Sequence, residues 1–79
     1  MSYLELTLAN FPPGIAEVLR LDLQTAPANR LKALGIFAGQ RIELAKAGNP
    51  MIIRAAGGCV AVAHEVASGI IVRSDPADV

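Results

Sequence analysis

The sequence contains no tryptophan, few other aromatic residues and no excess of charge of either sign. Of its 79 residues 4% are aromatic, and seven Lys and Arg balance seven Asp and Glu. Small β-barrels that bind nucleic acid use a basic face and aromatic side chains on which bases stack. Here only Tyr3, Phe11 and Phe37 could stack, so we expect no nucleic-acid partner.

The sequence also lacks paired cysteines and long apolar runs. Its single cysteine, Cys59, excludes an internal disulfide. Residues 1–5 do not have the basic start and continuous apolar stretch of a signal peptide. Apolar runs such as residues 51–53 are far shorter than the roughly 20 residues of a membrane-spanning helix. We therefore expect a cytoplasmic protein that does not insert directly into a membrane.

Length and hydropathy predict one folded domain over residues 1–79. The apolar fraction is 53% and the charged fraction is 18%, a balance typical of a globular chain rather than a disordered one. We expect a core of about residues 4–73. The polar segment 74–79 contains a proline and can bury little surface, so it is expected to form a frayed tail.

Alternating apolar residues between turn-forming segments predict a mainly β fold of about five short strands. The strands are expected over residues 16–23, 41–46, 51–55, 59–62 and 70–73. Residues 16–23 should carry their leucines on one face, and Ile42 and Leu44 should face the core. The connections are too short for the crossover helices of a parallel sheet, which favours a small, strongly bent antiparallel barrel.

One short helix is predicted over about residues 27–35, and a helical turn near residues 63–67. Pro27 suits the first turn of the helix, where its missing N–H is no loss. Gly35 should end the helix in the left-handed conformation. A Schellman cap at this position would bring Ile36 against Leu31.

The middle of the chain resembles the FeoA family, in which a helix ends in Leu-Gly-Ile and is followed by a turn, an alternating strand and a hairpin. The segments that carry this resemblance are residues 30–39, 41–44, 48–50, 57–58, 60–62, 66–67 and 70–72. Ala38 stands where the family usually has a proline, and the turn at Gly48-Asn49 is shorter than the family's longer form. The resemblance implies an SH3-like barrel.

The same resemblance implies a non-enzymatic cytosolic accessory protein of ferrous iron uptake. Such a protein would bind the cytosolic part of a FeoB-type transporter and assist its assembly or gating, with no cofactor and no catalytic residue. The domain also resembles the C-terminal module of DtxR-type metal-dependent repressors. The alternative hypothesis is therefore a metal-responsive regulatory module that binds a transition metal or a peptide.

His64, Glu65 and Cys59 are the candidate metal ligands, because imidazole, carboxylate and thiolate groups all bind first-row metals. Their spacing is not that of a closed site, since adjacent side chains on a helical turn diverge by roughly 100°. We therefore expect a surface histidine and a half-buried cysteine, and no metal site. A metal found in a crystal would be adventitious or intermolecular, joining His64 to Asp22, Asp75 or Asp78.

Three residues are predicted to lie on or near a partner-binding surface: Phe37, Ile52 and Arg54. Aromatic residues and arginine often carry interface energy, and the strand pattern does not direct Ile52 or Arg54 inward. The alternative for Phe37 is that it closes one end of the barrel. Residues 51–53 could also form an exposed edge, so weak self-association is a further possibility.

Overall fold

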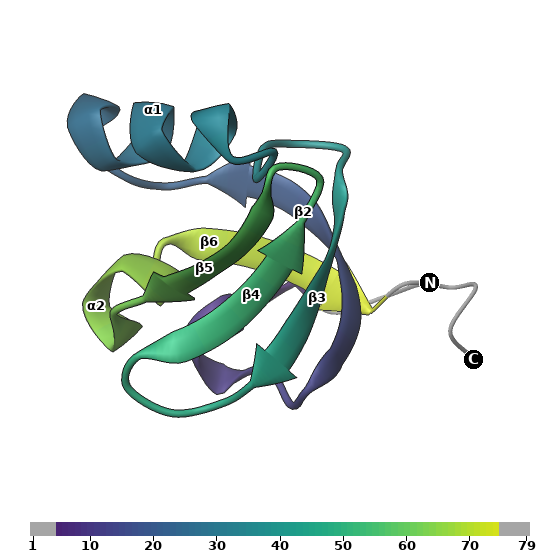
Figure 1. Ribbon diagram of the computed structural model, residues 1–79. Coiled ribbons are helices and arrows are strands. Elements are labelled where there is room, and N and C mark those ends of the chain that lie inside the picture. Colours follow the sequence, from purple (N-terminus) through teal and green to yellow (C-terminus); the bar gives the residue numbers. More distant parts are fainter. Residues whose placement is uncertain (1–4, 75–79) are drawn as a thin grey trace.

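The computed structural model of the chain describes residues 5–74, which form one antiparallel sheet of six strands with two short helices (Figure 1). The mainly β architecture predicted from the sequence is confirmed. The elements are β1 (Leu6–Thr7), the 3-10 helix η1 (Leu8–Asn10), β2 (Gly14–Leu21), α1 (Thr25–Ala33), β3 (Arg41–Lys46), β4 (Met51–Ala55), β5 (Gly58–Val62), α2 (His64–Ala67) and β6 (Ile70–Ser74).

The strand order is β1-β6-β2-β3-β4-β5, and β2 is shared between the two halves of the sheet. Residues 14–17 of β2 pair with β3, and residues 16–21 pair with β6. The register shifts once in β2, between Val18 and Arg20, and once in the β3–β4 pair, between Leu44 and Lys46. Such irregularities bend a strand and increase its twist. They allow the sheet to curl around its own inner face (Figure 1).

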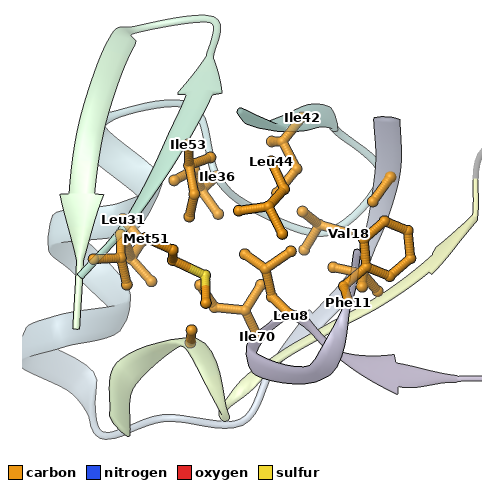
Figure 2. Close-up of a cluster of buried hydrophobic side chains, with 14 residues drawn as sticks. Leu8, Phe11, Val18, Leu31, Ile36, Ile42, Leu44, Met51, Ile53 and Ile70 are labelled. Atoms are coloured by element: carbon orange, nitrogen blue, oxygen red, sulfur yellow. The ribbon is translucent and has the colours of Figure 1, made fainter. Parts of the chain in front are cut away.

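The inner face of the sheet encloses an apolar core (Figure 2). Ile42 and Leu44 are 2% and 0% exposed, so the prediction that they face the core is confirmed. In β4, Met51 and Ile53 are buried, whereas Ile52 is half-buried and Arg54 is exposed. This alternation along β3 and β4 is the period-2 pattern expected when one face of a strand is buried.

The N-terminal part of the chain differs from the prediction. Five strands were expected, but Leu6–Thr7 adds a sixth, pairing with β6. The short helix η1 then places Leu8 in the core with no exposed surface. A strand of two residues is too short to show an alternation of apolar and polar side chains, and for this reason the sequence did not indicate β1. At the other end, Ser74 pairs with Ala16 as the last residue of β6, rather than belonging to the tail.

The first long strand also begins earlier than expected and buries a different set of side chains. β2 spans residues 14–21 rather than 16–23. Its buried residues are Ala16 and Val18, whereas Leu19 and Leu21 are only half-buried. Its pairing with β3 and β6 selects this face, because a strand shared by two neighbours takes its register from both.

Helix α1 spans residues 25–33, two residues earlier than predicted, and its C-terminal cap is the one expected. Gly35 has a φ of 90°. Its N–H donates to the carbonyl of Lys32, and the N–H of Ile36 donates to the carbonyl of Leu31 at 2.9 Å. These two bonds define a Schellman cap. Leu31 and Ile36 both belong to the core cluster, so the cap anchors the helix on the sheet (Figure 2).

The turn before β4 contributes a cap to helix α2. The side-chain Oδ1 of Asn49 accepts a hydrogen bond from the backbone N–H of His64 at 3.1 Å. Residue 63, which precedes the helix, is an alanine and supplies no side-chain cap of its own. The helical turn predicted near residues 63–67 thus depends on a residue that lies 15 positions away in the sequence.

We expect Asn49→Ala to lower the free energy of unfolding by about 1 kcal/mol, the usual cost of a lost N-terminal cap. Thermal denaturation followed by circular dichroism measures this loss. Asn10→Ala is the matched control, because Asn10 is also an exposed amide and makes only a local 3.3 Å hydrogen bond, to the hydroxyl of Thr7 in β1. Equal effects of the two substitutions would show that Asn49 does not cap α2.

Candidate functional site

An apolar groove lies between α1, β5 and α2. It has a volume of about 270 Å³. Its lining consists of Pro27, Arg30, Leu31, Leu34, Val60, Ala61, Val62, Ala63 and Val66. Pockets that take drug-sized ligands usually measure about 300–1,000 Å³. The volume of this groove is just below that range, and it suits a few apolar side chains of a partner.

The groove keeps its shape because the end of α1 is bonded to the β4–β5 turn. The N–H of Gly57 donates to the carbonyl of Leu34 at 2.9 Å. A Cβ atom at Gly57 would lie 2.7 Å from that carbonyl oxygen, so only glycine permits this approach. Figure 1 shows the turn beneath the end of α1, with β5 running from it toward α2.

Arg30 is the one charged side chain that lines the groove. It is exposed, and within residues 5–74 it forms no ion pair. Arg30 and Lys32 both lie in the last turn of α1, where a positive charge interacts favourably with the helix dipole. The groove therefore combines an apolar floor with one available positive charge at its rim.

The three residues predicted to bind a partner lie outside this groove. Ile52 and Arg54 are on the outer face of β4, which faces away from the core. Phe37 follows the cap of α1 and is 38% exposed, in contrast to Ile36, which has no exposed surface. That they bind a partner stays a prediction, and we call the outer face of β4 together with the loop after α1 the second candidate surface.

On this second surface, a row of polar side chains crosses three strands. Arg54 lies opposite Glu43 of β3 and Cys59 of β5, and its Nη1 is 3.2 Å from Glu43. The pKa of Arg54 is raised above its usual value, most strongly by a hydrogen bond with the Cys59 side chain and less strongly by the one with the Glu43 carboxylate. A raised pKa of a basic group contributes stability that is fully present below its unfolded pKa and is lost only as the pH rises through its folded pKa, so the contribution of Arg54 does not change with pH near neutrality.

The candidate metal ligands are not brought together. Cys59 lies near the start of β5, whereas His64 begins α2 beyond the other end of that strand, and the three residue steps from 59 to 62 alone span about 10 Å. All three candidates, including Glu65, are exposed, so the expectation of a half-buried Cys59 is wrong. Within residues 5–74, no group of three His, Cys, Asp or Glu side chains is placed to hold a metal ion. Asp75 and Asp78 lie outside the described residues.

Sequence reasoning assigned the lining residues to elements but did not predict the groove. Leu31 was expected on the buried side of the helix, and residues 60–62 were expected in a strand. What the sequence did not indicate is that β5 forms an edge of the sheet on the side where α1 lies. The available signal was the Gly57-Gly58 pair in the turn after β4, since adjacent glycines often mark a close approach of two backbones.

The curled six-stranded sheet with its short helices is an SH3-like fold. No helix of residues 5–74 is both long enough and apolar enough to span a membrane. The FeoA domain model matches residues 6–74, and the chain belongs to the FeoA domain family. This family is associated with ferrous iron transport and is a family of non-catalytic accessory domains.

Solved structures of FeoA proteins share the fold. The FeoA protein from Chlorobium tepidum aligns with a TM-score of 0.80 and 23% identity, over 87% of this chain and 70% of that one. The FeoA of Stenotrophomonas maltophilia aligns with a TM-score of 0.72 and 26% identity, over 92% and 93%. That protein was solved with zinc, and it is described as a prokaryotic SH3 domain protein and a candidate activating factor of ferrous iron transport.

The fold also occurs as part of a larger regulator. The manganese regulator SloR aligns with a TM-score of 0.75 and 18% identity, over 89% of this chain but only 34% of that one. At this identity the likeness establishes the fold alone. The predicted similarity to a module of DtxR-type regulators is confirmed at that level. No curated protein sequence matches the chain significantly.

Proposed function

We propose that the protein is an adaptor that binds the cytosolic part of a FeoB-type ferrous iron transporter and assists its assembly or gating. The observation that carries this proposal is the apolar groove between α1 and β5 in a member of a non-catalytic family associated with iron transport. A groove of this kind binds apolar side chains of a protein partner.

The test is a titration of the isotope-labelled protein with the cytosolic G domain of the transporter and, separately, with its cytosolic loops. Amide shifts confined to residues around the groove support the proposal. Shifts confined to Phe37, Ile52 and Arg54 would retain the adaptor function but move it to the second surface. If no transporter segment shifts any amide while Fe(II) shifts those around His64, the metal-responsive alternative replaces the adaptor.

We expect Val60→Thr to weaken transporter binding about three- to tenfold, because it places a hydroxyl in an apolar groove with little change of shape. Isothermal titration calorimetry measures the change. Ile52→Thr is the matched control: it makes a similar β-branched substitution at another half-buried strand position, on the outer face of β4. A larger effect of Ile52→Thr would contradict the assignment of the groove as the docking site.

A further inference from the structure

The two edges of the sheet are protected to very different degrees. The β1 edge is two residues long, leads directly into η1, and is flanked by the ion pair between Glu5 and Arg20 at 2.8 Å. Short strands and charged side chains are devices that prevent an edge from pairing with another chain. The opposite edge, β5, is five residues long and reads Gly-Cys-Val-Ala-Val, with neither a charge nor a proline.

The free side of β5 opens on the groove. Within residues 5–74 no strand pairs with β5 on the side away from β4. In an antiparallel ladder the N–H and C=O groups of every second residue point away from the paired strand, so alternate residues of β5 present them at this side. Val60 and Val62 line the groove beside Leu31 and Leu34 of α1. A strand added here would place every second side chain over that apolar lining.

The charge at the rim defines the chemistry of such a strand. Arg30 is the charged member of the lining, and it has no ion-pair partner within residues 5–74. A guanidinium group pairs best with a carboxylate, which it can hold with two hydrogen bonds. The complementary ligand is an extended segment in which apolar residues alternate with polar ones and an acidic residue lies on the apolar side.

We propose that an extended protein segment of this kind adds to β5 as a seventh strand, with its apolar side chains in the groove and a carboxylate against Arg30. The identity of the partner rests on the proposed adaptor function, but the chemistry of the segment rests on the groove itself. Main-chain hydrogen bonds to β5 supply affinity, and the groove and Arg30 select the side chains, as in other cases of strand addition.

The probe is a capped nonapeptide, Thr-Glu-Thr-Leu-Thr-Val-Thr-Glu-Thr. It places glutamate, leucine and valine on one face, and the glutamates near both ends make binding independent of strand direction. We expect saturable amide shifts around the groove, and slowed hydrogen exchange at alternate amides of β5. Two analogues carry backbone N-methyl groups on odd or on even residues. Only one of them should lose binding, because only one set of amides faces β5.

Arg30→Gln should weaken binding of the peptide about two- to fivefold, the effect of a partly exposed ion pair. Replacing the peptide's glutamates with glutamine should cause the same loss, and combining the two changes should cause no further loss. Lys32→Gln is the matched control, because Lys32 shares the last turn of α1 but does not line the groove. Its affinity should equal that of the unmodified protein.

Three results would overturn the proposal: no saturable shifts at millimolar peptide, equal binding of both N-methylated analogues, or alternate β5 amides already protected by dimers of the protein alone. The last result would make a second copy of this chain the occupant.

Failure of the adaptor function is a separate outcome. If the transporter domain does not bind but the peptide does, strand addition stands and the partner is different; if the domain binds without protecting β5, only strand addition fails.

Discussion

Gly57→Ala is expected to destabilise the domain by about 2–3 kcal/mol and to lower its melting temperature by about 10–20 °C. The added Cβ would lie 2.7 Å from the carbonyl oxygen of Leu34 and 2.9 Å from its carbonyl carbon and Cα. These are backbone atoms at the end of a capped helix, so they cannot rotate away as a flexible side chain could. The hairpin turn and α1 must separate, and the hydrogen bond from Gly57 to Leu34 is lost with them.

The same substitution should also weaken partner binding, because the contact at Gly57 sets the distance between α1 and β5. Differential scanning calorimetry measures the loss of stability, and amide shifts in α1 report the displacement. Gly58→Ala is the control. It adds the same methyl group one residue later, where no atom lies within 4 Å, and its cost comes only from a φ of 119°. A Gly57→Ala protein with normal stability and unshifted α1 amides would show that the close approach is not required.

Ile36→Ala is expected to cost about 2–4 kcal/mol, since it empties a fully buried position in the core. For a chain of this length the total stability is about 4–12 kcal/mol, so the variant would retain only a modest margin. The variant keeps the backbone hydrogen bond of the Schellman cap but loses the apolar side chain that places residue 36 in the same core cluster as Leu31. Urea denaturation measures the loss.

Phe37→Ala is the matched control at the next position. Phe37 is 38% exposed, so its truncation should cost about 1 kcal/mol or less although it removes more atoms. If Phe37 contributes to the second candidate surface, the variant stays folded and loses transporter affinity. If instead Phe37→Ala unfolds the domain, Phe37 closes the end of the barrel, and its assignment to a binding surface is wrong.

The elements with strong local signals were predictable. The helix C-terminus combined a glycine, an apolar residue after it and an apolar residue one turn before it, and the hydrogen bonds of the cap follow that pattern. The alternation in residues 41–46 correctly placed Ile42 and Leu44 in the core, and that in residues 51–55 directed Ile52 and Arg54 away from it. In each case the residues that decide the structure are within a few positions of one another.

The errors concern features that depend on distant residues. The leucines of β2 looked like its buried face, yet Ala16 and Val18 are buried instead, because pairing with both β3 and β6 sets the register. Likewise, the cap of α2 comes from Asn49 in another turn. Neither the register of a shared strand nor a long-range cap leaves a periodic signal in its own segment.

The sequence by itself determined the mainly β class, the capped helix and the family, because composition, alternation and turn residues act over short distances along the chain. Only the tertiary structure decided where a partner could bind. The groove exists because β5 forms an unprotected edge of the sheet and because Gly57 brings that edge close to α1. Its lining comes from three elements separated along the chain, and their proximity is a property of packing rather than of any local pattern.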